Sequence, residues 1–296
     1  MKTVKISGTK IIAPTAISGN HNTPPALPKA HALCVLVGRS RAGKSVSAVN
    51  LIKMMEYDYT ILVSPTANSN WDILQNLNIQ KDHTFDDLDD PMLIDKVKAI
   101  VEAERDDYVK YHEDMKQYNR LMKDMNRDGV RLNDNMLMRF YRNGNFEKPT
   151  HKWGGKRPKI ALLIDDSVQS KVFGKKLSQL CLLYRHIGSV KGEGAIGISP
   201  FVISQIYKSQ GNGLPKPVRA NATIWCLFKN YNEKEKKLIA EDLSFGMGAD
   251  RFVDMWDGVC DSKPYSFMFV DTSPKPEHLS MFRRCFDEFI IPQNFV

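Results

Sequence analysis

A chain of 296 residues that is 42% hydrophobic and 26% charged has an ordinary globular composition and can bury one large core. Its five cysteines are scattered without metal-ligand spacing, which argues against a zinc site and favours reduced thiols. The N-terminus lacks the apolar stretch of a secretory signal, and no apolar run approaches the roughly 18 residues that span a bilayer. We therefore expect an intracellular protein without a membrane segment. The net charge of +8 favours a polyanionic partner such as nucleic acid.

The first part of the chain has the order strand, loop, helix, strand. Residues 1–30 are rich in Pro, Thr, Asn and Gly and are expected to form an N-terminal arm. The apolar run 33–37 predicts a buried strand, and apolar residues at helical spacing over 46–55 predict a helix. A second strand is predicted at 59–63. Between the first strand and the helix stands GRSRAGKS, residues 38–45.

The middle of the chain departs from this alternation. Residues 91–126 are highly charged with apolar side chains at helical spacing, and a second amphipathic piece follows at 135–141. A Gly-containing loop comes next. We expect 67–158 to be a mainly helical insertion in a single domain whose core comprises 31–66 and 159–296.

The α/β pattern then resumes. A run of apolar residues at 159–164 predicts a buried strand that ends in two aspartates. Strands buried on both faces and alternating with helices favour a mainly parallel central sheet flanked by helices. The later elements predicted by the same patterns are strands at 201–204, 223–228 and 265–270 and helices at 175–187 and 233–243.

GRSRAGKS matches the phosphate-loop pattern G-x-x-x-x-G-K-S in the strand–loop–helix context that such a site requires. Gly38 and Gly43 let consecutive backbone N–H groups face a polyphosphate, and the helix N-terminus adds positive potential. Lys44 can reach the β- and γ-phosphates of ATP, and the Ser45 hydroxyl is the expected Mg²⁺ ligand. The predicted nucleotide contacts are Gly38, Arg39, Ser40, Arg41, Ala42, Gly43, Lys44, Ser45 and Val46.

Polar side chains follow two of the later strands. Asp165 is expected to hold the Mg²⁺ through a water, and Asp166 to orient or deprotonate the attacking water. Gln205 ends the strand PFVISQ and could contact the γ-phosphate or the attacking water; an ordinary surface glutamine is the alternative. Together with the phosphate loop, these residues predict ATP hydrolysis.

Four arginines have two possible roles each. Arg185 and Arg219 could stabilise transition-state charge across a subunit boundary, or form ordinary surface ion pairs. Arg39 and Arg41 lie inside the loop, where they add positive charge beside the phosphates or point outward to an adjacent subunit.

In this order, the segments GRSRAGKS, LLIDD, YRH, ISQ and VRANATIWCLF resemble the viral genome-packaging ATPases of the FtsK–HerA group, which occur in poxviruses, other large DNA viruses and virophages. The resemblance covers roughly residues 31–230, and YSFMFVD and MFRRCF resemble the end of the family's chains. It implies an α/β P-loop NTPase of the additional-strand, RecA-like type.

The same resemblance implies a function. Family members form homo-oligomeric rings, pentamers or hexamers, that use ATP and Mg²⁺ to thread double-stranded DNA into a preformed capsid, in the host cytoplasm or virus factory. The family's phosphate and metal contacts, carboxylates, sensor and trans-acting or sensing arginines fall, in that order, on Lys44 and Ser45, Asp165 and Asp166, Gln205, and Arg219 with Arg185. The chain departs from the wider motor class in having Asp at 166, where much of that class has Glu.

Motors of this kind grip the phosphate backbone without reading base sequence. Residues 105–159 carry 14 Lys or Arg against 8 Asp or Glu, which is most of the excess positive charge. Two loops are candidate DNA contacts: 208–216, and the basic segment that contains Lys152, Lys156, Arg157 and Lys159.

Other functions fit the sequence less well. A GTPase would need a guanine-recognition signature, which NYNEKEKK lacks, and a small-molecule kinase would need a substrate pocket and an Arg-rich lid. A structural protein with a degenerate nucleotide site is disfavoured by the intact Lys44, Ser45 and Asp165. The main alternative is a cellular DNA-translocating ATPase of the FtsK–HerA type, although such proteins commonly carry membrane segments or additional DNA-reading domains.

Overall fold

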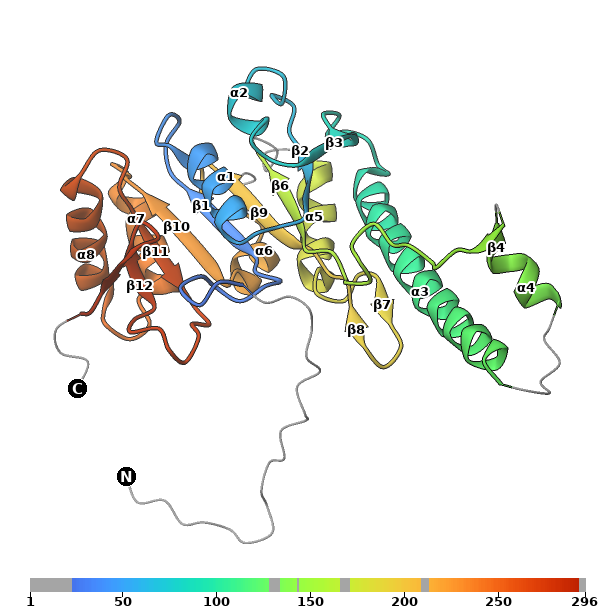
Figure 1. Ribbon diagram of the computed structural model, residues 1–296. Helices are drawn as coiled ribbons and strands as arrows, with labels where there is room; N and C mark the ends of the chain where they lie inside the picture. Colours follow the sequence, from blue (N-terminus) through green and yellow to red (C-terminus); the bar gives the residue numbers. More distant parts are fainter. Residues whose placement is uncertain (1–22, 128–133, 143, 166–170, 209–212, 293–296) are drawn as a thin grey trace, which may run out of the picture.

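The strand that precedes the phosphate loop, β1 (Cys34–Val37), lies inside a nine-stranded sheet (Figure 1). The order across the sheet is β13-β12-β11-β10-β1-β9-β6-β2-β3. Neighbouring strands from β10 to β3 are parallel, whereas β11, β12 and β13 pair antiparallel. The computed structural model describes residues 23–127, 134–142, 144–165, 171–208 and 213–292.

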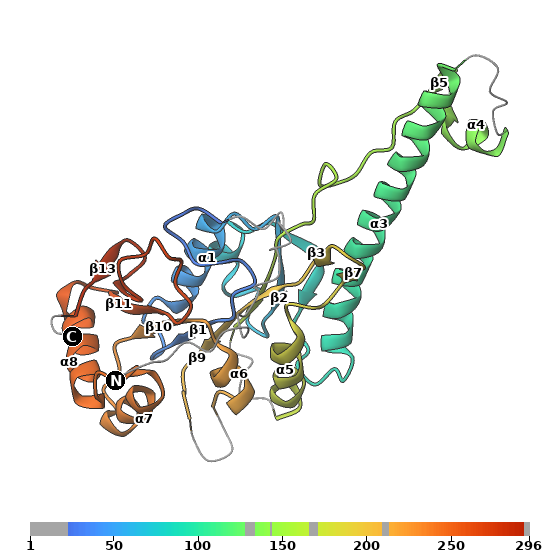
Figure 2. The ribbon, with the colours of Figure 1, turned by 90° about the horizontal axis from the view of Figure 1, so that it is seen from below.

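Helices cover both faces of this sheet. Along β1, Val35 and Val37 belong to the hydrophobic core on one face, and Cys34 and Leu36 to the core on the other. Helix α1 (Lys44–Met54) covers the second face, while α5 to α8 and the first half of α3 cover the first (Figure 2). The other strands of the sheet are β2 (Tyr59–Val63), β3 (Ile79–Phe85), β6 (Ile160–Ile164), β9 (Ser199–Ser204), β10 (Ile224–Phe228), β11 (Phe267–Asp271), β12 (Phe282–Arg284) and β13 (Glu288–Ile290).

One strand separates β1 from β6. β9 pairs with β1 on one side and with β6 on the other, and all three run parallel. The carboxyl ends of these strands therefore meet at one edge of the sheet, where ligands bind in open α/β folds. A strand inserted between the phosphate-loop strand and the aspartate strand defines the additional-strand P-loop NTPases, so the expected fold class is confirmed.

The helices after β6 follow the predicted order with three differences. α5 (Lys171–Leu183) ends before the turn at 184–188, and neither α6 (Lys216–Asn221) nor α8 (Ala249–Ser262) was expected. α8 buries Phe252, Trp256, Val259 and Cys260, which share one helical face. α6 and α7 (Glu233–Leu243) cover the same face of the sheet as α5 and α8.

A long helix projects from the body of the molecule. α3 (Leu93–Met125) packs against the sheet through its first half, and its second half extends away from the core (Figures 1 and 2). We call this outer half of α3, together with the elements at its end, the arm. These elements are α4 (Asp134–Phe140), β4 (Tyr141–Arg142) and β5 (Asn145–Phe146).

The segment expected to be a helical insertion, 67–158, also contains a strand of the main sheet. After the short helix α2 (Trp71–Leu74), β3 pairs in parallel with β2 and forms the sheet edge. Its sequence IQKDHTF is mostly polar because only His83 in the middle is buried. The part of the segment that extends away from the sheet is therefore the arm.

The N-terminal segment 23–26 is bound by side chains from the end of the chain. Lys275 donates to the carbonyl oxygens of Thr23 and Pro24, and Arg283 Nη1 donates to that of Ala26. The His278 ring nitrogen Nε2 lies 2.8 Å from the Pro25 carbonyl oxygen. We call this set of contacts the terminal clamp.

The cysteines match the expectation of reduced thiols. All five are free, and Cys34, Cys181, Cys226 and Cys260 are buried. Burial raises the pKa of the Cys181 and Cys260 thiols to about 12, so they stay protonated at neutral pH. Within the described ranges, no helix has the length and apolarity to cross a membrane.

Candidate nucleotide site

The phosphate loop connects the end of β1 to the start of α1. Arg41 and Gly43 adopt left-handed backbone conformations, with φ of 61° and 93°, and α1 begins at the next residue, Lys44. The first turn of α1 has no acidic residue and no side-chain cap, so its N–H groups and positive dipole end are open to an anion. The loop therefore has the backbone form of a phosphate site.

Gly38 permits a close approach between the loop and β10. A Cβ atom at Gly38 would lie 2.5 Å from the Cβ of Phe228, closer than two carbon atoms can pack. On the other side, the Gly38 N–H donates to the Ser204 carbonyl of β9 at 3.3 Å. The first glycine of the motif thus anchors the loop between its two neighbouring strands.

The predicted lysine, serine and aspartate come together above this edge. The Lys44 ammonium donates to the Arg39 carbonyl oxygen at 2.7 Å, inside the loop. The Ser45 hydroxyl donates to Asp165 Oδ2 at 2.9 Å, across 120 residues of sequence. Asp165 is buried at the end of β6, where its N–H bonds the Val63 carbonyl at 3.0 Å.

A hydroxyl and a carboxylate held together are the hard oxygen donors that Mg²⁺ prefers. Among the described residues there is no cluster of three or more His, Cys, Asp and Glu that could hold a metal without further ligands. A P-loop site needs no such cluster, because phosphate oxygens and water complete the Mg²⁺ shell. Ser45 and Asp165 therefore fit the expected metal contact.

A cleft of about 640 Å³ opens over the loop. Lys44, Ser45, Asp165 and Gln205 all line it, so the structure brings these four predicted residues to one place. Gln205 follows β9 directly, which places it between the loop and Asp165. The predicted loop contacts Ser40, Arg41, Gly43 and Val46 line the cleft as well.

Sequence reasoning missed four residues of this cleft. Ser47 lies in the first turn of α1, Asn70 and Ile73 come from the segment around α2, and Tyr265 comes from the turn before β11. Tyr265 was expected to belong to a strand, but its φ of 62° excludes it from the extended region. Nothing in the local pattern of the sequence indicated that the segments around α2 and before β11 meet the loop.

Two predicted residues are not found among the described residues of this cleft. Asp166 lies outside the described residues, so its role in activating water stays a prediction. Arg39 points toward β10, with its guanidinium carbon 5.0 Å from the centre of the Tyr231 ring. Arg39 and Ala42 line a second hollow on that side of the loop.

Arg219 is engaged within its own chain. It lies on α6, where Nη1 bonds Asp242 Oδ2 at 2.7 Å and the guanidinium stacks on the Tyr207 ring at 5.1 Å. Tyr207 OH donates to the same carboxylate oxygen at 2.5 Å. Arg219 does not line the cleft over the phosphate loop.

Arg185 lies at the opposite edge of the sheet. It follows α5 and lines a hollow of about 180 Å³ together with Ile224, the first residue of β10, and Asp271, the last residue of the antiparallel β11. Its Nε donates to the Tyr184 hydroxyl at 2.8 Å. Arg185 therefore lies away from the nucleotide site of its own chain, and a role in a neighbouring subunit's site stays a prediction.

The candidate DNA segment that contains Lys152, Lys156, Arg157 and Lys159 includes residues that hold the fold together. Arg157 is buried, and its Nη1 donates to the carbonyl oxygens of Glu193 and Ala195 in the hairpin of β7 (Ser189–Val190) and β8 (Gly194–Ala195). It is therefore not available to DNA, which corrects that expectation. Lys159 bonds the Met55 carbonyl at 3.0 Å, whereas Lys156 is exposed.

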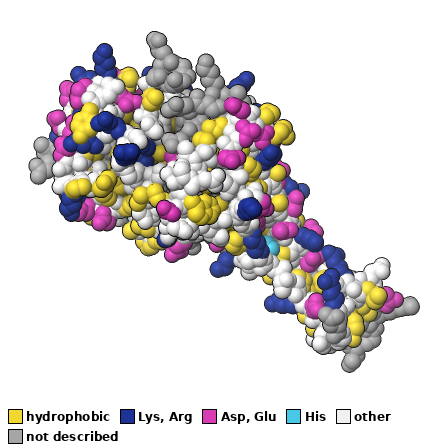
Figure 3. Space-filling model, turned by 90° about the horizontal axis from the view of Figure 1, so that it is seen from above, with side chains coloured by type: hydrophobic (Ala, Val, Ile, Leu, Met, Phe, Trp, Pro, Cys, Tyr) yellow, Lys and Arg dark blue, Asp and Glu magenta, His cyan; other side chains and the backbone are white. Residues whose placement is uncertain are grey.

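The second loop, 208–216, is described only at its ends. Lys208 is exposed and forms an isolated bridge with Gly213; residues 209–212 lie outside the described ranges. Figure 3 shows basic and acidic side chains intermixed over one face of the body, with basic side chains also along the arm.

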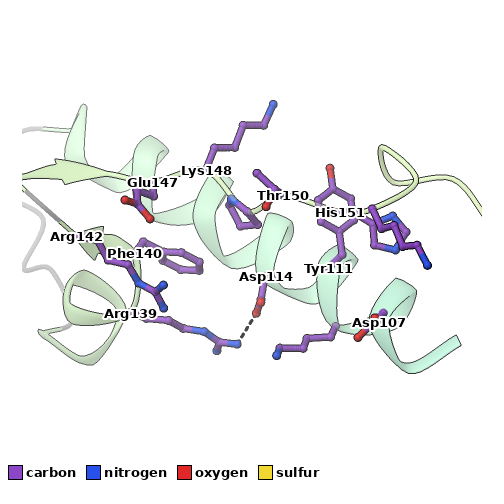
Figure 4. A pocket seen from close by; sticks show the side chains of 13 residues that line it. Asp107, Tyr111, Asp114, Arg139, Phe140, Arg142, Glu147, Lys148, Thr150 and His151 are labelled. Atoms are coloured by element: carbon purple, nitrogen blue, oxygen red, sulfur yellow. Dashed lines mark hydrogen bonds and ion pairs between the residues drawn. The ribbon is translucent and has the colours of Figure 1, made fainter. Parts of the chain in front are cut away.

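A further hollow of about 610 Å³ lies on the arm, between α3, α4 and the returning segment 147–152 (Figure 4). Tyr111 and His151 lie side by side at one end, and Arg139 pairs with Asp114 at the other. Its lining mixes both charges, so it has no strong preference for an anion or a cation.

Comparison with known proteins gives distant structural neighbours. No family model matches the chain, and no curated protein matches it. The DNA-packaging ATPase B204 of Sulfolobus turreted icosahedral virus is 14% identical, with a TM-score of 0.45 over 86% of this chain and 97% of that one. The packaging NTPase B204 of Sulfolobus turreted icosahedral virus 2, in complex with ATP-gammaS, is 12% identical, with a TM-score of 0.42 over 86% and 96%.

A conjugation coupling protein is similar to the same degree. The pCW3 protein TcpA, in monomer form with ATPgS, is 13% identical, with a TM-score of 0.42 over 87% of this chain and 61% of that one. These likenesses are remote, and the site is defined by the loop, strands and side chains of this chain.

Proposed function

We propose that this chain is an ATPase: it binds ATP with Mg²⁺ in the cleft over residues 38–46 and hydrolyses it. The observation that carries the proposal is the hydrogen bond of 2.9 Å between Ser45 Oγ and Asp165 Oδ2. It joins the phosphate loop, which follows β1, to the end of β6, and β9 lies between these two strands. A buried carboxylate and a loop hydroxyl have no structural need to meet there, but a metal–phosphate complex requires both.

Each residue of the cleft has a distinct task in this proposal. The loop N–H groups and Lys44 bind the β- and γ-phosphates and offset their negative charge. Ser45 and Asp165 would hold the Mg²⁺, which when bound neutralises charge on the phosphates. Gln205 contacts the γ-phosphate or the attacking water, and Asp166 accepts the proton of that water.

We further propose that hydrolysis drives a motor that moves double-stranded viral DNA into a preformed capsid during virion assembly in the infected cell. The support is the resemblance of the motif series GRSRAGKS, LLIDD, ISQ and VRANATIWCLF to packaging ATPases. On this proposal the subunits form a ring, and Arg185 reaches the nucleotide of a neighbour. Arg219 would do so only by leaving its contact with Asp242.

The test is phosphate release from ATP and Mg²⁺, measured with and without duplex DNA. We expect turnover that duplex DNA stimulates, and complexes whose mass rises toward a ring when an ATP analogue and DNA are both present. Absence of hydrolysis in every condition, from protein shown to be folded, would overturn the ATPase proposal. Turnover that is indifferent to DNA would leave an ATPase and remove the motor.

Lys44→Ala should lower turnover by at least about 100-fold, since it removes the cation at the transferring phosphate. Lys53→Ala is the matched control, because Lys53 is an exposed lysine in the last turn of the same helix.

Asp166→Ala should bind ATP and barely hydrolyse it; full turnover would show that another group activates the water. Mixing Arg185→Ala with Asp166→Ala subunits tests action in trans, because only a shared site can be restored in the mixture.

A further inference from the structure

A second hollow, of about 660 Å³, lies on the other side of the phosphate loop from Asp165. It shares Ser40, Arg41 and Tyr265 with the phosphate cleft, so the two spaces meet at these residues. The phosphate cleft reaches Asp165 and Gln205 at the ends of β6 and β9. The second hollow lies instead beside β10 and the turn before β11, where Phe228 and Ser266 line it.

Tyr265 at this junction has an unusual conformation. Its φ of 62° is in the left-handed region, which a bulky residue rarely adopts. The side chain is nevertheless 74% exposed, so burial of the ring does not hold it there. Backbone strain of this kind occurs mainly at functional sites, where the surrounding structure fixes a side chain in position.

The ring of Tyr265 lies against the end of the loop. A Cβ atom at Gly43 would be 3.6 Å from Cδ1 of Tyr265, which is van der Waals contact. The tyrosine therefore borders the residue just before α1, on the side of the loop that faces β11. Among the described residues it has no hydrogen bond or aromatic partner, so the part of the ring that does not contact Gly43 is open to a planar group.

These positions set the direction of a bound nucleotide. With the terminal phosphate near Gln205 and Asp165, the chain of phosphates crosses the loop toward β10 and β11. The sugar and base must then emerge at the junction of the two hollows, where Tyr265 stands.

From this geometry we infer that Tyr265 stacks on the nucleobase and so makes the site select a nucleoside triphosphate over a bare polyphosphate. The inference rests on the proposed nucleotide site and adds to it the residue that recognises the base. Stacking suits any base, because every base has a π face, and the larger purine rings gain more contact.

Tyr231 provides a contrast in the same hollow. It is also an exposed tyrosine, but Arg39 and Lys229 lie 5.0 Å and 5.2 Å from the centre of its ring. Lys229 is in turn paired with Asp261. Two cations already occupy the surroundings of this ring, so it is a matched control for the open ring of Tyr265.

The experiment compares two probes by calorimetric titration in the presence of Mg²⁺: a non-hydrolysable ATP analogue and inorganic tripolyphosphate. Tyr265→Ala should weaken binding of the ATP analogue by about 5- to 150-fold, the range expected for one lost stacking contact, and leave tripolyphosphate binding unchanged. Tyr265→Trp should keep the preference for the analogue. Tyr231→Ala should change both affinities together or neither.

Other outcomes distinguish a failure of the stacking role of Tyr265 from a failure of the proposed nucleotide site. If the unmodified protein binds both probes and Tyr265→Ala keeps the full preference for the ATP analogue, the stacking role is wrong and the phosphate site stands. If Tyr231→Ala alone removes that preference, the base lies on the other tyrosine and the inference is also wrong. If neither probe binds folded protein, the nucleotide site itself fails and the inference with it.

Discussion

At the scale of single residues, the phosphate loop depends on one position without a side chain. The sequence shows Gly38 as the first residue of a motif, but the structure gives the reason: the loop passes so close to β10 that Phe228 occupies the space of a Cβ atom. The need for glycine here comes from contact between segments 190 residues apart, and the backbone angle does not impose it.

Gly38→Ala should therefore lower the free energy of unfolding by about 1–3 kcal/mol, the usual cost of forcing extra atoms into a packed site. Gly258→Ala is the control, since Gly258 lies inside α8 with open space where the Cβ would be. That change should raise stability by about 0.5–1 kcal/mol, because alanine favours the helix. Urea unfolding without nucleotide measures both; equal effects of the two variants would contradict the packing argument.

At the scale of elements, the parts visible in the sequence are those buried on both faces. β1, β2, β6 and β10 are short apolar runs because each is wholly covered, and the run alone predicts them. β3 was missed because an edge strand with one buried residue in seven looks like a loop. α8 was missed although its buried residues Phe252, Trp256 and Val259 have helical spacing.

The nucleotide site was likewise predictable where it depends on the wholly buried strands, and not where it depends on contacts between distant segments. Lys44, Ser45, Asp165 and Gln205 follow from strands whose ends meet in any parallel sheet of this order. Arg185 and Arg157 carried no local signal of their positions. Arg185 lies at the far edge of the sheet, and Arg157 is held by the β7–β8 hairpin. Both positions result from packing between distant segments, which the sequence of one segment does not show.

The hairpin contact gives a test of Arg157. Arg157→Met removes the guanidinium and leaves the carbonyl oxygens of Glu193 and Ala195 without this donor, so stability should fall by about 1–3 kcal/mol. Lys156→Met changes an exposed neighbour and should stay within about 0.5 kcal/mol of the parent. Urea unfolding and duplex binding at low salt are the measurements. A stable Arg157→Met variant that has lost DNA binding would show that the side chain serves DNA instead of the fold.

At the scale of the whole molecule, the terminal clamp joins the two ends of the described chain. Arg283 is 1% exposed, and it bonds the carbonyl oxygens of Ala26 and Phe286 and the His278 ring. Burial lowers the pKa of its guanidinium, yet the charge persists at neutral pH because arginine titrates far above it. The N-terminal segment is thus attached to the antiparallel side of the sheet before it reaches β1.

Arg283→Met should lower the free energy of unfolding by about 2–4 kcal/mol, since it removes a buried guanidinium that bonds three acceptors at once. It should also expose the segment at 23–31 to trypsin, which cuts at Lys29. Arg284→Met is the control, because the neighbouring arginine is half-exposed and its ion pair is with Glu288, which lies opposite it on β13. Equal losses in the two variants, or a segment that resists trypsin in Arg283→Met, would contradict the clamp.

The terminal clamp also decides where mechanical tension enters the molecule. A pull applied at Thr23 is resisted first by Lys275 and Arg283, which belong to the segment around β12. Segment 27–33, which leads into β1, would carry none of the applied force until those bonds break. A subunit held by its N-terminal end would therefore transmit force through the antiparallel side of its sheet, and the spacing between Lys44 and Asp165 would be isolated from that force.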